Sequence, residues 1–344
     1  MKLSTGSKKE SEGRPDKEKS GTGRRRLGFK IAMPVLSVLV TLFLAEAGLR
    51  RFYWEHFFMY QDEKSLLYRY DEVLGWFPIP NARERFLASR VFSVTNNSEG
   101  FRAPEHVPSN KPGIAFIGDS FVWGYDAEAE ERFTDKLQTK RPEWSVYNLG
   151  VSGYGTDQEY LLLQRFFDKY KPRVVFLLYC VETDHDDNSS NMRYGGYYKP
   201  YCTVAGNRLE LHGVPVPRSD RAFFAEHAAL GRSCLIQLVV RAYFKAISPA
   251  KLNNPDPTGA IINDLNKYVK SKGAALVIGL TLHNPRLEEF LDYLKIPFLD
   301  LSTPLRYPGY GAHWTPEGHT YVCGKIDQFM TKGGYLGEPN MPAN

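Results

Sequence analysis

Five short apolar runs alternate with segments of helical periodicity from residue 113 onward, and this alternation restricts the possible folds more than any other feature of the chain. Short apolar runs predict strands that are buried on both faces, and strands joined through helices run parallel. We therefore expect an α/β domain in which a parallel sheet lies between two layers of helices. The predicted strands are 114–117, 145–149, 174–179, 274–281 and 297–301, and the predicted helices are about 131–140, 157–169, 258–272, 285–294 and 316–331.

The segment from about 186 to 255 breaks this alternation, because it contains Tyr-, Gly- and Pro-rich loops and then an apolar helix near 223–246. We interpret it as an insertion beyond the carboxyl ends of the strands, where parallel sheets bind their ligands. Its tyrosines either stack on sugars or pack against their own domain. They are Tyr194, Tyr197, Tyr198 and Tyr201.

The N-terminal region is predicted to anchor the chain in a membrane. Residues 1–26 are basic and poor in large apolar side chains, which is typical of a disordered tail. Residues 31–45 carry no charge, and the wider stretch 27–49 reaches the roughly 20 residues that a spanning helix needs. A basic tail stays in the cytoplasm by the positive-inside tendency. The sequence thus predicts a single-pass protein of the cell inner membrane, with its C-terminal domain in the periplasm.

Two other interpretations of the apolar segment stay open. Ala45-Glu46-Ala47 is similar to a small-residue cleavage site behind a basic region, so the segment is either an anchor or a signal peptide. Cleavage would release a soluble esterase. A buried core helix is the third interpretation. The aromatic cluster Phe52-Tyr53-Trp54 favours a retained anchor, because such side chains suit a membrane interface.

Charge and composition exclude two classes of protein. The formal charge of +5 comes from residues 1–30, which hold ten Lys/Arg against four Asp/Glu, so the other 314 residues sum to −1. A nearly neutral body argues against a nucleic-acid partner. A hydrophobic content of 42% excludes disorder of the chain as a whole. The four cysteines lack metal-type spacing and leave the disulfide state open.

We predict a partly structured stem at 50–110, the domain at 111–335 and a flexible tail at 336–344.

A serine follows the first predicted strand directly, in Gly118-Asp119-Ser120. An α/β sheet presents a nucleophile at this position, and the N-terminus of the next helix offers backbone N–H groups to a developing anion. Gly, Asp and Ser are also ordinary turn and capping residues. The tripeptide alone therefore does not define a site.

Three further blocks accompany this tripeptide. Asn97-Ser98-Glu99-Gly100-Phe101-Arg102 precedes it, NLGVSGYGTD at 148–157 follows the second strand, and HWTPEGH at 313–319 opens the last helix. In this order the four blocks resemble the SGNH/GDSL hydrolase superfamily, particularly its membrane-anchored bacterial branch, over residues of about 90–335. The resemblance implies a three-layer, flavodoxin-like parallel sheet and an ester hydrolase that uses no cofactor and no metal.

The resemblance also implies roles for individual residues. Ser120 matches the nucleophile, and His313 matches the general base that accepts the serine proton. Backbone N–H groups of Ser120 and Gly153 would form the oxyanion hole. His319 is expected to pack on its helix, Asp119 to bond the local backbone, and Trp314 to line either the pocket or the core.

The chain departs from the family pattern at two places. The family's Asn donor to the oxyanion is replaced by Thr183, which has a shorter side chain but still offers one hydroxyl donor. The family's Asp, two or three residues before the histidine, is replaced by Gly311 and Tyr310, and neither carries a carboxylate. Compensation is expected from Asp300, from a backbone carbonyl or from an acidic residue at 184–187.

The acidic run from Glu182 to Asp187 also invites a metal interpretation. Neighbouring side chains on an extended segment point in different directions and rarely reach one ion, so we favour capping, substrate contact or solvent exposure. We therefore predict no metal and no cofactor at this place.

These observations lead to two hypotheses of function. The first is a membrane-anchored, extracytoplasmic serine esterase or O-acyltransferase that acts on an acylated small molecule or an envelope polysaccharide. The second is a catalytically impaired member of the same fold that serves as a binding or assembly component. Retention of Ser120, Gly153 and His313 favours the first, and loss of the usual Asp and Asn favours the second.

Overall fold

The structure is a computed structural model that describes residues 21–57, 63–107, 109–206, 208–309 and 311–335. It divides into two compact units. The first contains the N-terminal helix together with Ser233–Leu238, and the second contains most of the remaining chain. We describe each unit separately.

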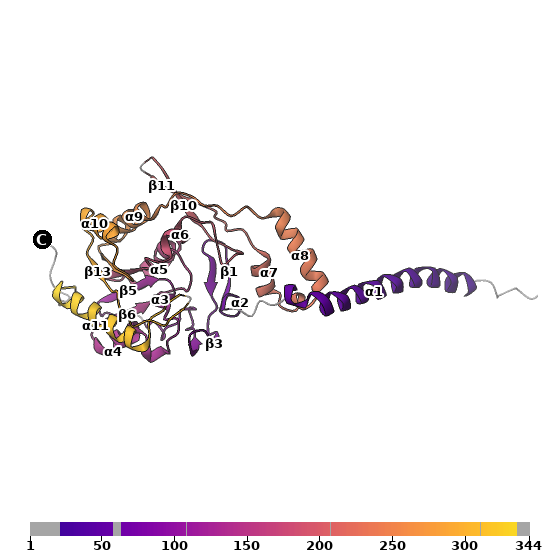
Figure 1. The fold of residues 1–344 in the computed structure, drawn as a ribbon, viewed down its shortest axis with the longest axis horizontal. Coiled ribbons are helices and arrows are strands. Elements are labelled where there is room, and N and C mark those ends of the chain that lie inside the picture. The colour runs from indigo at the N-terminus through magenta and orange to yellow at the C-terminus, as the bar shows by residue number, and fades with distance from the viewer. Residues whose placement is uncertain (1–20, 58–62, 108, 207, 310, 336–344) are drawn as a thin grey trace, which may run out of the picture. The chain divides into compact units, whose positions relative to one another are not determined.

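Five parallel strands form the central sheet of the second unit, in the order β13-β12-β7-β5-β6 (Figure 1). The order reverses between β5 and β7, because β6 lies on one side of β5 and the later strands lie on the other. Loops that follow β5 and β7 therefore open into one crevice at the carboxyl edge, where such sheets bind ligands. The strands are β5 (Gly113–Gly118), β6 (Ser145–Asn148), β7 (Val174–Tyr179), β12 (Ala275–Leu280) and β13 (Phe298–Asp300).

Helices cover both faces of this sheet, which confirms the predicted three-layer α/β fold. In Figure 1, α9 and α10 lie above the sheet, whereas α4 and α11 lie below it. Each predicted strand agrees with the structure within one residue at either end, and each of the five helices predicted around the sheet within two. The single helix predicted near 223–246 is wrong, because a break between residues 226 and 234 divides it into α7 (Asp220–Glu226) and α8 (Cys234–Ile247). The helices are α4 (Phe133–Lys140), α5 (Thr156–Tyr170), α9 (Thr258–Ser271), α10 (Pro285–Tyr293) and α11 (Pro316–Lys332).

Alternating side chains of each strand build two separate cores. On β7, Val175 and Leu177 pack with α5 and α9, whereas Phe176 and Leu178 pack with α4 and α11. All six residues of β7 are buried. A strand buried on both faces has no polar side, which is why its sequence appears as an uninterrupted apolar run.

The region predicted as a stem at 50–110 is part of the domain over most of its described length. Trp76, Phe92 and Phe101 are at most 1% exposed and belong to the same core as α5. Two antiparallel hairpins carry Trp76 and Phe92, and Phe101 follows the second of them. The elements are α2 (Glu63–Leu67), β1 (Tyr68–Asp71), β2 (Gly75–Pro78), β3 (Arg83–Leu87) and β4 (Val91–Thr95).

The insertion at about 186–255 leaves the sheet after α6 (Asp184–Asn188) and forms small hairpins followed by two helices. A buried ion pair between Lys199 of the insertion and Asp157 at the start of α5 fastens it to the domain. Its elements are β8 (Met192–Arg193), β9 (Tyr197–Tyr198), β10 (Tyr201–Ala205), β11 (Arg208–His212), α7 (Asp220–Glu226) and α8 (Cys234–Ile247).

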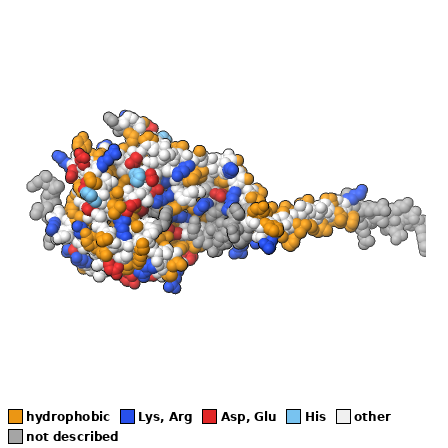
Figure 2. All heavy atoms as spheres, viewed as in Figure 1, with side chains coloured by type: hydrophobic (Ala, Val, Ile, Leu, Met, Phe, Trp, Pro, Cys, Tyr) orange, Lys and Arg blue, Asp and Glu red, His pale blue; other side chains and the backbone are white. Residues whose placement is uncertain are grey.

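The first unit is dominated by helix α1 (Gly21–Phe57). It begins at Gly21, within the stretch predicted as a tail at 1–26, and the rest of that tail lies outside the described residues. Residues 29–53 of α1 are long and apolar enough to cross a membrane, with a mean hydropathy of 2.0 in the most apolar window. Figure 2 shows apolar side chains along the outside of this helix. Length and composition fit a membrane span or a signal sequence equally. The tail predicted at 336–344 lies outside the described residues.

Candidate active site

Ser120 stands at the turn between β5 and the short helix α3 (Ser120–Trp123). Asp119 caps this helix, because its Oδ1 accepts a hydrogen bond from the Phe121 N–H at 2.9 Å. This contact agrees with the structural role expected for Asp119. The helix ends at Gly124, whose left-handed conformation turns the chain sharply. Helix α3 is therefore capped at both of its ends, and Ser120 at its first position is held at the carboxyl edge of the sheet.

His313 comes from the loop before α11 and meets Ser120 across 193 positions of sequence. The Nε2 atom of His313 lies 2.8 Å from the Oγ atom of Ser120, within hydrogen-bond distance. The loop is fastened by a hydrogen bond from the Tyr307 N–H to the His313 carbonyl at 2.9 Å. The Tyr125 ring stacks on the imidazole with a centroid distance of 4.6 Å. The structure thus brings together the two residues predicted as nucleophile and base.

Asp126 lies at the other nitrogen of the same imidazole. Its Oδ2 is 3.5 Å from His313 Nδ1, an ion-pair distance slightly outside good hydrogen-bond geometry, and neither atom has a hydrogen-bond partner among the described residues. The other carboxylate oxygen accepts the Ser89 N–H at 2.9 Å. Burial raises the pKa of Asp126, but the nearby His313 imidazole and the hydrogen bond from Ser89 outweigh it and leave the pKa below its ordinary value. Asp126 is therefore a carboxylate at neutral pH.

Gly311, at one of the two positions where the family pattern has its Asp, has no room for a side chain. The backbone of Gly311 has a φ of +82°, and a Cβ added there would lie 2.5 Å from Cε1 of His313. The imidazole thus occupies the space that a side chain at 311 would need. Tyr310 lies outside the described residues.

The compensating groups expected from the sequence lie elsewhere, so that expectation is wrong. Asp300 accepts a hydrogen bond from the Ser302 N–H at 2.8 Å. Asp184 accepts one from the Cys180 N–H, and Asp187 pairs with Arg193. Asp126 is in the turn that follows Ser120, at a φ of +62°. In sequence it appears as a turn residue, so only its place six residues after the serine could have suggested it.

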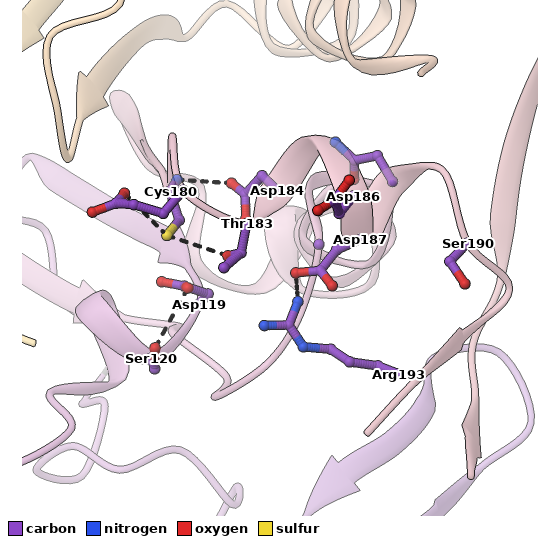
Figure 3. Close-up of polar contacts among 12 residues, drawn as sticks. Asp119, Ser120, Cys180, Thr183, Asp184, Asp186, Asp187, Ser190 and Arg193 are labelled. Carbon is purple, nitrogen blue, oxygen red and sulfur yellow. Dashed lines mark hydrogen bonds and ion pairs between the residues drawn. The ribbon is translucent and has the colours of Figure 1, made fainter. Parts of the chain in front are cut away.

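Of the predicted oxyanion-hole residues, Thr183 lines the cavity beside Ser120, and Gly153 lies against Tyr194 in the wall of that cavity. Gly153 has a φ of +81°, and a Cβ added there would lie 2.2 Å from the hydroxyl oxygen of Tyr194. Glycine is required here for both reasons. Thr183 lines the same cavity as Ser120, and its hydroxyl donates to the Cys180 sulfur at 3.3 Å. Figure 3 shows Thr183 above Asp119 and Ser120, with the Arg193 side chain reaching toward Asp187 beside them.

A cavity of about 590 Å³ opens beside Ser120 and His313. Its wall includes charged side chains as well as apolar ones, among them Glu63, Glu182 and Arg193. Among the four tyrosines considered for sugar stacking, Tyr194 lines this cavity, Tyr197 and Tyr198 are buried, and Tyr201 stacks on His212. The cavity thus has the size of a small-molecule site.

The acidic run after β7 does not converge on one point. Asp186 is exposed, whereas Glu182 accepts a hydrogen bond from the Thr281 hydroxyl at 2.6 Å and pairs with Arg306. A different trio, Asp119, Cys180 and Asp184, has possible ligand atoms within 4.8 Å of one another. Burial raises the pKa of all three. Asp119 accepts the Phe121 N–H and Asp184 accepts the Cys180 N–H, so we assign this trio to the buried hydrogen-bond network.

His319 and Trp314 are structural. His319 is 1% exposed and its Nδ1 accepts the Phe133 N–H at 3.3 Å. Burial lowers the pKa of His319 to about 3, with repulsion from Arg132 adding to the effect. The ring is therefore neutral. Trp314 is fully buried and packs edge-to-face on Phe121 with a centroid distance of 4.8 Å.

Comparison with solved structures finds chains that match about two thirds of this chain at low sequence identity. A GDSL-like lipase from Bacteroides thetaiotaomicron is 14% identical, with a TM-score of 0.35, and the match covers 67% of this chain and 93% of that one. A member of the lipolytic G-D-S-L family from Veillonella parvula is 12% identical, with a TM-score of 0.38 and coverages of 64% and 98%.

A two-domain esterase active on acetylated mannans is 13% identical, with a TM-score of 0.36 and coverages of 68% and 52%. No protein-family model and no curated protein matches the chain. At these identities the likeness concerns the fold, so a functional assignment has to come from the site itself.

Proposed function

We propose that the protein is a serine hydrolase of O-acyl esters, in which Ser120, His313 and Asp126 act as a triad. The observation that carries the proposal is the chain of contacts from Ser120 Oγ to His313 Nε2 at 2.8 Å and from His313 Nδ1 to Asp126 Oδ2 at 3.5 Å. A serine hydroxyl becomes nucleophilic when a neighbouring imidazole accepts its proton, and a carboxylate at the far nitrogen stabilises the resulting imidazolium.

The reaction follows from these positions. Ser120 Oγ attacks the acyl carbonyl while His313 Nε2 takes the hydroxyl proton. The anionic oxygen is received by the backbone N–H groups of Ser120 and Gly153, with the Thr183 hydroxyl as a third donor. His313 then gives the proton to the leaving alkoxide, and an acyl ester on Ser120 remains. Water, or a hydroxyl of a second substrate, attacks this ester after giving its proton to His313, and the serine is restored.

We further propose that the acyl group sits on a polar molecule such as an envelope polysaccharide. The cavity supports this choice, because Glu182, Arg193 and Tyr194 offer ionic and hydrogen-bonding groups close to Ser120. A long apolar acyl chain would remove these charged and polar groups from water without adding a hydrogen bond to them, which is unfavourable. Transfer to a sugar hydroxyl and hydrolysis share every step before deacylation, so the acceptor decides between esterase and acyltransferase.

An extracytoplasmic, membrane-anchored setting is part of the same proposal. Glu46 occupies the centre of the segment that is similar to a cleavage site, yet its carboxylate accepts hydrogen bonds from the Cys234 N–H and the Leu235 N–H, both at 3.0 Å. Cleavage there would separate α1 from these partners. This contact supports retention of α1 as an anchor, and the basic residues that precede it support a cytoplasmic N-terminus.

A fluorophosphonate probe tests the catalytic proposal. The full chain in detergent micelles should be labelled, whereas Ser120→Ala should not and His313→Ala should be labelled far more slowly. The same preparations should hydrolyse p-nitrophenyl acetate in the same order. Well-folded wild-type protein that neither reacts with the probe nor hydrolyses the ester would favour the binding or assembly alternative. Comparison of acetate released with acetate transferred to a xylo- or manno-oligosaccharide separates hydrolysis from transfer.

A further inference from the structure

Helix α8 (Cys234–Ile247) presents an apolar face to the outside of the molecule. Val239 is 70% exposed, Tyr243 is 59% exposed and Ile247 is 57% exposed. With Ile236 they follow the i, i+3, i+7, i+11 spacing of one helix face. A row of large exposed apolar side chains on one helix is uncommon on a soluble surface and indicates an interaction site.

The start of this helix is tied to the end of the predicted anchor. Ser233–Leu238 form one compact unit with α1. The carboxylate of Glu46 accepts hydrogen bonds from the Ser233 hydroxyl and from the first two N–H groups of α8, and Arg50 holds the same carboxylate at 2.7 Å. Glu46 follows the uncharged run of the anchor directly. The first turn of α8 therefore lies beside Glu46, in the same compact unit as the predicted anchor.

The charge around α8 suits an anionic lipid surface. Between Glu226 and Asp256 the chain contains no acidic residue but four basic ones. These are Arg232, Arg241, Lys245 and Lys251, of which Arg241 pairs with Asp220 of α7 at 3.8 Å. Basic residues that flank an apolar helix face are typical of helices that lie in the membrane interface. Each such residue near an anionic leaflet adds attraction, since the surface potential there is negative.

We propose that α8 is an interfacial helix, whose face of Ile236, Val239, Tyr243 and Ile247 lies in the acyl and headgroup boundary of the bilayer that α1 spans. The inference rests on the anchored setting proposed above and is independent of the catalytic activity. The occupant of the face is lipid rather than protein, because the hydrogen bonds of Glu46 hold the helix start beside the anchor.

A depth measurement tests this inference in the full chain. Val239→Cys and Tyr243→Cys carry a nitroxide label in vesicles of phosphatidylcholine and phosphatidylglycerol, and Tyr293→Cys, 81% exposed on α10, is the matched control. The four native cysteines are buried, which limits background labelling. Labels at 239 and 243 should collide more with oxygen than with a water-soluble nickel chelate, and the label at 293 should show the opposite ratio.

Each outcome has a defined meaning. Nickel-accessible labels at 239 and 243 in a chain that resists carbonate extraction would overturn the interfacial helix and leave the anchor intact. A chain released by carbonate would overturn both. Pulsed dipolar spectroscopy measures the distance between the labels at position 239 of two chains. A short distance that is retained in detergent micelles would show that the apolar face of α8 contacts a second copy of the chain instead of lipid. Val239→Asp with Tyr243→Asp should abolish the lipid contact and leave hydrolysis of p-nitrophenyl acetate unchanged.

Discussion

Asp126 and Ser120 lie at opposite nitrogens of the His313 imidazole, although both belong to the segment that follows β5. The carboxylate of Asp126 lies 3.5 Å from Nδ1 of His313, and the hydroxyl of Ser120 lies 2.8 Å from Nε2. The acid that orients the histidine therefore comes from the block that carries the nucleophile. This relationship leads directly to the first two predictions.

Asp126→Asn should strongly reduce turnover. The amide no longer stabilises the imidazolium, and the corresponding change in serine proteases lowers kcat by about 10⁴. We expect a loss of about 10²–10⁴ in kcat on p-nitrophenyl acetate, with little change in KM. Asp186→Asn, on an exposed acidic side chain, is the control and should keep wild-type kinetics. Equal activity of both variants would exclude Asp126 from the triad.

Gly311→Asp, which restores an acid at the family position, should impair the enzyme. Any Cβ at 311 would lie 2.5 Å from the imidazole, and the backbone there is left-handed. His313 would have to move away from Ser120, so the fluorophosphonate labelling rate should fall. The double variant with Asp126→Asn should be no more active than Asp126→Asn alone. Rescue in the double variant would show that the His313 loop accommodates the usual acid.

Thr183→Val should show how much the Thr183 hydroxyl, the third proposed oxyanion donor, contributes to kcat. Loss of one such donor costs about 10²–10³ in kcat in other serine hydrolases, and a weak donor costs less. We expect a reduction in kcat with KM nearly unchanged, whereas Thr183→Asn should keep or raise kcat. Thr320→Val, on the exposed side of α11, serves as the matched control. A Thr183→Val variant with full kcat would remove Thr183 from the oxyanion hole.

Glu159→Gln should stabilise the protein as the pH rises. Glu159 is fully buried, and neither carboxylate oxygen has a hydrogen-bond partner among the described residues. Burial, and then the charges of Asp184 and Asp119, raise the pKa of Glu159 well above its ordinary value. The unfolded chain releases this proton near pH 4.3, about the ordinary value for Glu, and the folded chain retains it. Stability is therefore lost as the pH rises above that value.

The measurement is urea unfolding of both proteins between pH 5 and pH 9. The free energy of unfolding of Glu159→Gln should exceed that of the wild type by an amount that grows with pH. Glu289→Gln, on an exposed side chain of α10, is the control and should follow the wild type. A constant difference across the series would contradict the raised pKa.

His319→Asn should reduce the acid sensitivity of the fold. Burial lowers the pKa of His319 to about 3, whereas the unfolded residue titrates near 6.5, so folding releases a proton between these values. Stability is full above about pH 6.5 and falls by up to about 1.4 kcal/mol per unit as the pH drops through that window. The variant should show a smaller slope between pH 6.5 and pH 5 than the wild type in thermal or urea unfolding. An unchanged slope would assign the acid sensitivity to other groups.

The strands and helices of the domain were predictable because burial on two faces leaves a direct pattern in sequence. Val174–Tyr179 is an uninterrupted apolar run for that reason. Ser120 and His313 were identified from the ordered set of four blocks that resembles the family, because a Gly-Asp-Ser turn alone is also an ordinary capping sequence. Trp76 and Phe92 were harder to place, because short hairpins that pack by one or two aromatic side chains have no period that can be recognised in the sequence.

Asp126 could not be identified as the partner of His313 from sequence. Its role depends on a left-handed backbone at 126 and on the ring position that the loop at 302–315 imposes, and both are properties of the three-dimensional structure. The contact between Tyr194 and Gly153 could not be predicted either, because the insertion brings the Tyr194 ring to Gly153 from a distant part of the chain.

The shared turn of Ser120 and Asp126 also determines how the triad responds to motion. Where the acid and the histidine share a loop, that pair shifts as a unit and loses contact only with the nucleophile. In this chain the loop carries the histidine without its acid, so one displacement of the loop stretches both contacts of the imidazole at once. If Ser120, His313 and Asp126 form the proposed triad, a change that displaces the histidine should therefore weaken both contacts of the imidazole together.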